Sequence, residues 1–156
     1  IFHVDQIDGT LLVARDYPVA GNVAWGDHFD LITSSSIGDG LENTQIMVNR
    51  NAEDNSMVTN GLEFGSDNYV FKIALDLVHE GFDDWFIPTS DSMQAIFDNV
   101  YTKGMGNFNQ TYIYWSSTKE GYYPYVMGFN LNSWGGETFT GSCFDVNGVL
   151  IVRKFR

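Results

Sequence analysis

The chain of 156 residues carries 20 acidic side chains against eight lysines and arginines, which gives a formal net charge of −12 at pH 7. This charge repels nucleic acid, anionic lipid and sulfated polysaccharide at long range, so none of them is an expected partner. With 44% apolar and 18% charged residues, the sequence predicts a folded chain, organised as one domain over residues 1–156 around one core.

Cysteine content and hydropathy narrow the class of protein further. A single cysteine, Cys143, excludes an internal disulfide and a multi-cysteine zinc site. No window approaches the roughly 20 apolar residues needed to cross a bilayer, so membrane insertion is not expected. Because the chain starts with Ile1 inside a predicted strand, we expect a processed protein or a part of a longer one.

The first predicted elements are two strands, at about residues 2–7 and 10–14. They are joined by Asp8-Gly9, a pair suited to the positive φ angles of a tight hairpin turn. Residues 16–65 are rich in Gly, Asn, Ser and Asp, which predicts mostly loop.

Helical patterns occupy the middle of the chain. A short helix can follow Asn43 or Thr44, either of which could cap it. The clearest helix lies within residues 67–81, where apolar positions follow the helical repeat and Gly81 can end the helix. Another follows Pro88, which suits the start of a helix, and places an apolar stripe on residues 93–100.

Strand patterns return in the last third of the chain. Residues 125–132 alternate with a period of two, and Tyr125 and Phe129 lie on the apolar stripe that we expect in the core. Asn147-Gly148 predicts a second hairpin, joining residues 142–146 to a central strand within 149–155. Because no βαβ alternation or internal repeat is visible, the fold class is predicted to be α+β with a mainly antiparallel sheet.

Four motifs carry a resemblance to a known family. They are "GDGLENT" at 38–44, "GFDDWFIPTSDSM" at 81–93, "YWSST" at 114–118 and "VRKFR" at 152–156. In this order and spacing they resemble the Lcl C-terminal-type domains of bacterial surface proteins and phage fibres. One departure is Met93, which stands where relatives carry the Glu that completes a capping box with Ser90.

The resemblance implies a C-type lectin-like fold, in which a mainly antiparallel sheet has two flanking helices and long loops. It also implies that the N- and C-terminal strands lie close together, and that the protein acts outside the cell or on a virion surface. Some relatives are receptor-binding tips diversified by retroelements, and their variable positions fall between the Y-W-S-S-T and V-R-x-V-R motifs.

A candidate ligand-binding surface lies in this same interval. Tyrosine and tryptophan offer large contact area with few rotamers to lose, and Ser, Thr, Asn and Gly offer adaptable hydrogen bonds. From the residues alone, ordinary turn positions beside a core strand explain the pattern equally well, whereas the resemblance favours recognition. The candidate residues are Tyr122, Tyr123, Asn132, Trp134, Thr138 and Thr140.

Other polar residues favour structural roles. Asp83 and Asp84 are adjacent and therefore point to opposite sides of an extended chain, so we expect one of them to hydrogen-bond the turn before Trp85, a core anchor. The three histidines have no metal-binding or hydrolase spacing, and His79 is expected in the last turn of its helix.

The acidic residues of the loops are considered as ligands for calcium, which some lectin-like folds bind. Five acidic residues could supply oxygen ligands, but the E-P-N and W-N-D triplets of sugar-binding lectins and the EF-hand spacing are absent. We therefore interpret these residues as solvated acids and expect no cofactor. They are Asp27, Asp30, Asp39, Glu42 and Asp54.

Three functions are compatible with the sequence. The first is a non-enzymatic, adhesin-like domain that recognises a cell-surface glycan or protein at the exposed end of a phage fibre or bacterial surface protein. The second is a structural or decoration subunit of a virion or surface filament, with homo-oligomers formed through a parent fibre. The third, a relative of formylglycine-generating enzymes, rests on Cys143 alone.

Overall fold

The computed structural model describes residues 1–7, 9–14, 23–26, 31–53, 67–130, 135–142 and 146–155. The helices among them are α1 (Gly40–Glu53), α2 (Val70–Asp76) and α3 (Ser90–Asn99), with short 3₁₀ helices at Ile37–Asp39 and Tyr101–Lys103. The strands are β1 (His3–Asp5), β2 (Gly9–Val13), β3 (Val23–Ala24), β4 (Ile113–Glu120), β5 (Tyr123–Gly128), β6 (Phe139–Thr140), β7 (Val146–Asn147) and β8 (Val152–Phe155).

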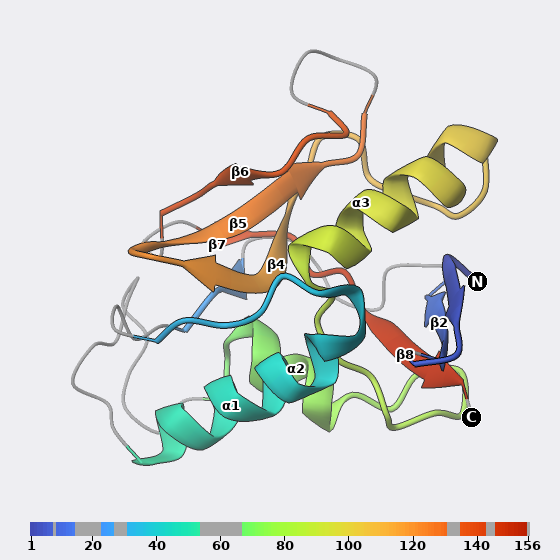
Figure 1. The fold of residues 1–156 in the computed structure, drawn as a ribbon. Helices are drawn as coiled ribbons and strands as arrows, with labels where there is room; N and C mark the ends of the chain where they lie inside the picture. Colours follow the sequence, from blue (N-terminus) through green and yellow to red (C-terminus); the bar gives the residue numbers. More distant parts are fainter. Residues whose placement is uncertain are drawn as a thin grey trace.

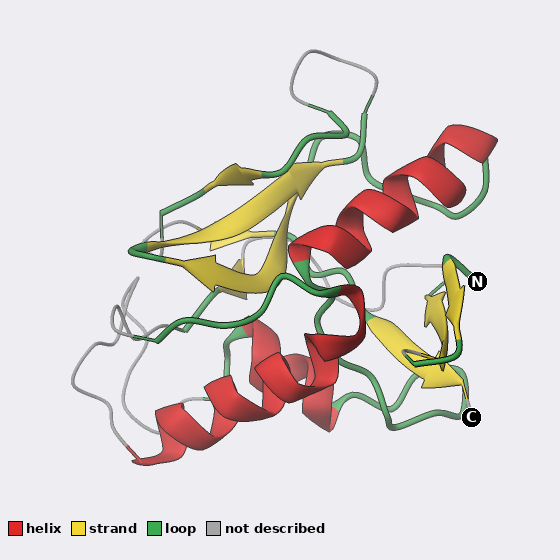
Figure 2. Ribbon diagram, in the orientation of Figure 1, coloured by secondary structure: helices red, strands yellow, loops and turns green. Residues whose placement is uncertain are grey.

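The described strands form antiparallel sheets, so the predicted α+β class is confirmed. The sheets have the orders β1-β2-β8, β3-β7 and β4-β5-β6. Figure 1 shows the β4-β5-β6 sheet and the sheet of the terminal strands on different sides of the molecule, with α1 and α2 below the former. Helix α3 contacts β1, β4 and β5 and so joins the two sides, and Figure 2 shows the helices beside both sheets.

The terminal strands lie together, as the resemblance implied. Strands β1 and β2 form the expected hairpin, in which Val4 pairs with Thr10. Strand β1 is shorter than predicted, whereas β2 has the predicted length and begins one residue earlier. Strand β2 pairs on its other edge with β8, in a register that sets Thr10 opposite Phe155. The two ends of the described chain therefore share one sheet.

The hairpin predicted at Asn147-Gly148 is wrong. Strand β7 pairs with β3, and Gly148 instead lies beside β4, where its N–H donates to Ile113 O at 2.7 Å and its carbonyl accepts from Trp115 N at 3.1 Å. A Cβ atom on Gly148 would lie 2.9 Å from the Tyr114 ring. This glycine therefore allows a close approach of two chain segments and does not form a turn.

Residues 149–152 join two hydrophobic clusters, where the sequence suggested one core. Val149 and Ile151 pack in the first cluster with the tryptophans, whereas Leu150 and Val152 pack in the second with Met93 and Phe129. An extended segment points alternate side chains to opposite sides, so a continuous apolar run fills both clusters at once. The regular strand β8 begins only at Val152.

Three helices are present among the described residues, and the first of them, α1, is longer than the short helix predicted, because it starts at Gly40, before Asn43. The residues expected to cap it lie inside it and face the interior. The Asn43 amide donates to Ser34 O at 2.7 Å, and the Thr44 hydroxyl donates to Gly40 O and accepts from Ile87 N. Polar side chains at these positions therefore satisfy buried backbone groups rather than a helix end.

The ends of α2 and α3 also differ from the prediction. Helix α2 ends at Asp76, so His79 lies in the turn beyond it and not in its last turn. The cap of α3 is Thr89 rather than Ser90, and its side chain accepts from Ser92 N at 3.1 Å. Met93 is buried in the second cluster, which explains its apolar character one turn into this helix.

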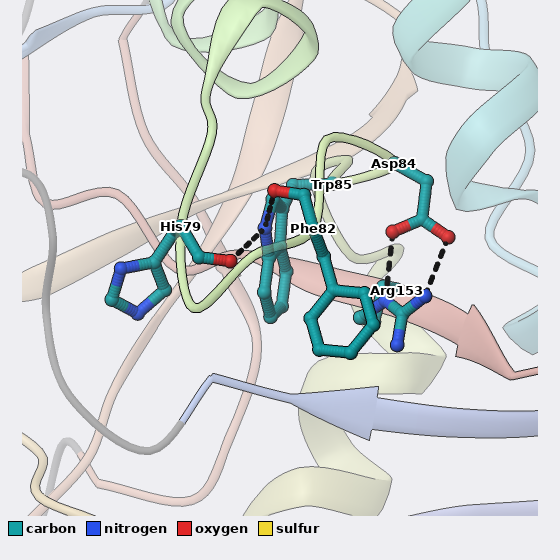
Figure 3. A network of polar contacts seen from close by, with 5 residues as sticks. All are labelled: His79, Phe82, Asp84, Trp85 and Arg153. Atoms are coloured by element: carbon teal, nitrogen blue, oxygen red, sulfur yellow. Dashed lines mark hydrogen bonds and ion pairs between the residues drawn. The ribbon is translucent and has the colours of Figure 1, made fainter.

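A tight turn after α2 positions Trp85, which is buried as predicted (Figure 3). His79 and Phe82 exchange two backbone hydrogen bonds of 2.9 and 3.0 Å, and Glu80 and Gly81 between them both have positive φ angles, of 53° and 81°. This is the pattern of a type I′ turn. The Trp85 indole N–H donates to both carbonyls of the turn, at 3.3 and 3.1 Å.

Asp84, one of the two aspartates considered for a bond to this turn, forms an ion pair with Arg153 (Figure 3). The Asp84 carboxylate accepts two hydrogen bonds from Arg153, at 2.7 and 2.8 Å, and the guanidinium lies 3.6 Å from the centroid of the Phe82 ring. The hydrogen bond to Asp84 raises the pKa of Arg153 further above its usual range. The pair connects the loop before Trp85 to β8.

The positive φ angle of Glu80 leads to a prediction about the stability of the protein. A left-handed conformation is unfavourable for Glu but is tolerated by Asn. We expect Glu80→Asn to stabilise the protein by roughly 0.5–1 kcal/mol and to raise Tm by about 1–4 °C in calorimetry. Glu137→Asn is the matched control, because Glu137 is exposed but has no positive φ. Equal effects of the two substitutions would contradict the turn conformation.

Candidate functional site: the end of the β4-β5-β6 sheet

The candidate site is carried by the hairpin of β4 and β5. Strand β4 continues to Glu120 and β5 begins at Tyr123, so only two residues join them. Gly121 has a φ of 86°, whereas Tyr122 keeps a negative φ. A two-residue loop with glycine in its first central position is a type II′ turn, which matches the twist of the paired strands.

The register of the sheet brings several polar and aromatic residues onto one face. Glu120 pairs with Tyr123, and Tyr125 pairs with Thr140 on β6. Tyr123 and Tyr125 are two residues apart on one strand, so all four side chains point to the same side. The Tyr125 hydroxyl donates to the Glu120 carboxylate at 3.4 Å. Together with Tyr122, we call these residues the hairpin surface.

The opposite face of the same strands belongs to the core. Val126 is buried in the first hydrophobic cluster with Trp115, and Phe139 packs against that cluster. On the hairpin surface, by contrast, Tyr122 is 72% exposed and Tyr123 is 52% exposed. The sheet therefore buries one face and presents two large aromatic side chains at the tip of the other.

The six predicted site residues have different outcomes. Tyr122, Tyr123 and Thr140 come together on the hairpin surface, and Thr140 is exposed. Thr138 precedes β6 and is half-buried. Asn132 and Trp134 lie outside the described residues.

Sequence reasoning missed two members of the hairpin surface and a neighbouring acid. Tyr125 was expected in the core but is only partly buried, whereas Phe129 is buried as predicted. Glu120 is not among the six predicted site residues. Asp91 is an exposed residue in the first turn of α3, and the pKa of its carboxyl is raised by partial desolvation and, to a smaller extent, by the charge of Glu120. No pattern in the local sequence predicts that the start of α3 lies beside a hairpin about 30 residues later in the chain.

Buried hydroxyls behind the hairpin explain this arrangement. Between Trp115 and Lys119 the pairing of β4 with β5 shifts register, which removes regular partners from the backbone of Ser116, Ser117 and Thr118. Other groups replace these partners: Trp25 Nε1 donates to Ser116 O at 2.9 Å, and Ser117 N donates to Pro88 O at 2.7 Å. The hydroxyls and several backbone groups of the buried "YWSST" motif therefore form structural hydrogen bonds.

The same hydroxyls bind the neighbouring elements. The Ser116 hydroxyl donates to Tyr125 O at 2.7 Å, across the shifted register. The Thr118 hydroxyl accepts from Ser90 N, the first residue of α3, at 2.9 Å and donates to Ser34 O at the same distance. These bonds set the start of α3, and with it Asp91, beside the hairpin.

Of the five acidic residues considered as calcium ligands, the structure describes two. Asp39 accepts a hydrogen bond of 2.6 Å from the Ser34 hydroxyl, and Glu42 lies in the first turn of α1. Asp27, Asp30 and Asp54 lie outside the described residues, as do His28 and Cys143. In the part of the chain that the structure describes, no three His, Cys, Asp or Glu side chains are grouped to hold a metal ion.

None of the described helices is long and apolar enough to cross a membrane.

The raised pKa of Asp91 predicts a pH-dependent effect on stability. The folded state binds the proton of the Asp91 carboxyl more tightly than the unfolded state does. The stabilisation that this gives is fully present below the ordinary pKa of 3.8 and is lost as the pH rises through the pKa of the folded state. Asp91→Asn should therefore stabilise the protein at pH 7, by less than about 1 kcal/mol, and not at pH 3. Urea denaturation at both pH values measures this difference.

Asp67→Asn, which removes an exposed aspartate before α2, is the control for this measurement. A loss of stability at pH 7 in Asp91→Asn would show that the helix dipole outweighs burial and the repulsion by Glu120.

Comparisons with known proteins add no relative. The chain matches no protein-family model, and a search of curated proteins finds no match either.

Proposed function

We propose that this protein is a non-enzymatic binding domain, which uses the hairpin surface to recognise a glycan or a protein on a cell surface. The observation that carries the proposal is the exposure of Tyr122 and Tyr123 at the tip of a hairpin whose base is fixed by buried hydrogen bonds. Rigid aromatic side chains lose little conformational entropy when they contact a ligand. Thr140 and the Tyr125 hydroxyl supply hydrogen bonds beside them.

Charge limits the ligands that this surface favours. Glu120 lies on the hairpin surface and Asp91 beside it, in a chain with a net charge of −12. Acidic groups at an interface repel anionic partners and attract cationic ones. The ligand is therefore neutral or cationic, and sulfated glycans are disfavoured.

The resemblance to Lcl C-terminal-type domains supports the setting of this proposal. In that setting the fold is C-type lectin-like, and the domain lies at the exposed end of a phage fibre or bacterial surface protein. The shared sheet of the terminal strands agrees with such a fold, because it places both chain ends on one side of the domain. The hairpin surface belongs to a different sheet and is available at another part of the molecule.

A second candidate function is supported by the outer face of the β1-β2-β8 sheet. Val4 and Phe155 both pair with Thr10, so they share one face, and they are 69% and 60% exposed. Exposed apolar side chains on a sheet are typical of contacts between subunits. This observation favours a structural or decoration subunit of a virion or filament, packed through this face.

The proposal is tested by replacing the two exposed tyrosines. In Tyr122→Ala/Tyr123→Ala we expect binding on a glycan array and to intact bacterial cells to fall at least tenfold, because hot-spot aromatics each contribute about 2 kcal/mol or more. The thermal unfolding temperature should change little, since neither side chain is buried. Calorimetry alongside the binding assay checks both expectations.

Phe155→Ala is the matched control, since it removes an equally exposed aromatic side chain from the other sheet. Loss of binding in this control, with full binding in the tyrosine variant, would overturn the site. Light scattering that shows an oligomer dissociated by Phe155→Ala would support the subunit function instead.

A further inference from the structure

Lys119 is placed where a charged side chain is unfavourable. It is the last residue but one of β4, next to an exposed turn, yet it is 0% exposed. Removing an ammonium group from water is costly unless its protons are bound by acceptors. A lysine at the end of a hairpin strand would normally extend into solvent, so its burial calls for a physical reason.

The ammonium group binds the turn of the hairpin directly. Lys119 Nζ donates to the carbonyl of Gly121 at 2.7 Å and to the carbonyl of Leu31 at 3.0 Å. The backbone of the same residue is fixed as well, because its N–H donates to the Thr33 hydroxyl at 3.0 Å and its carbonyl accepts from Thr33 N at 3.1 Å. Lys119 thus connects the turn to the segment that runs beside β4.

The carbonyl of Gly121 belongs to the central peptide of the type II′ turn. Rotation of this peptide by about half a turn converts a type II′ turn into a type I′ turn, in which the second central residue needs a positive φ. That residue is Tyr122, for which a positive φ is strained. A charge-assisted hydrogen bond to Gly121 O therefore holds the peptide in the orientation that keeps Tyr122 in its favourable conformation.

We infer that Lys119 is a positioning residue, whose buried ammonium group fixes the central peptide of the hairpin turn and thereby pre-organises Tyr122 and Tyr123 for binding. This inference rests on the proposed binding function of the hairpin surface. The ligand is not touched by Lys119, which acts through the Gly121 carbonyl. Without the ammonium group the turn samples more conformations, and a ligand must then order it on binding.

Lys119→Met tests the inference, because methionine keeps much of the length of the side chain and removes the donors. The readout is the ¹⁵N order parameter of the amides of residues 121–123. We expect values near the rigid level of about 0.85 in the wild type and below about 0.6 in the variant, with no change in the three helices. Lys72→Met is the matched control, since Lys72 pairs with Asp76 on the exposed side of α2.

Unchanged order of residues 121–123 in Lys119→Met would overturn the inference. In the same variant, binding to the glycan array and to bacterial cells should weaken about two- to tenfold, the range expected when a few rotatable groups must be ordered. Failure of the binding proposal has a different signature, because it appears as full binding in Tyr122→Ala/Tyr123→Ala, whatever the order of the turn.

The wild-type protein decides the question if Lys119→Met does not fold. Slow solvent exchange of the Lys119 ammonium protons, with a coupling across the hydrogen bond to the Gly121 carbonyl carbon, supports the inference. An ammonium group that exchanges and reorients as fast as that of Lys72 overturns it.

Discussion

The register shift in β4 is the constraint on which the rest of the structure depends. It frees the backbone groups of Ser116, Ser117 and Thr118 from the β4-β5 pairing, and each buried group must then find another partner. Those partners come from distant parts of the chain, including Trp25, Thr33 and the residues around Pro88. One irregular strand thereby gathers the start of α3, the segment before α1 and the hairpin into a single unit.

The same constraint leads to the binding proposal. Hydrogen bonds at the base of the hairpin allow its tip to be exposed and ordered at once, which ordinary loops achieve less well. Lys119 extends the network into the turn, one residue pair from Tyr123. Affinity in this account comes from aromatic contact on a fixed support, and selectivity comes from the carboxylates of Glu120 and Asp91.

The features that could be predicted from the sequence are those controlled by residues close together in the chain. The first hairpin, the helix after Pro88 and the burial of Trp85 follow from turn residues, an apolar stripe and side-chain volume. The hairpin at Asn147-Gly148 was predicted wrongly because Gly148 allows a close approach to Tyr114. The length of α1 was underestimated because Asn43 is a typical cap residue, whereas its amide donates to the Ser34 carbonyl. These roles depend on contacts between residues far apart in the chain.

The candidate site follows the same pattern, since Tyr122 and Tyr123 were named as candidates from the sequence, whereas Tyr125 and the acidic neighbours were found only in the folded chain. The most direct test of the account is chemical-shift mapping of the labelled protein with a glycan selected on the array. The account predicts the largest shifts at Tyr122, Tyr123 and Thr140. Shifts centred on the β1-β2-β8 sheet, with an unchanged hairpin, would contradict it.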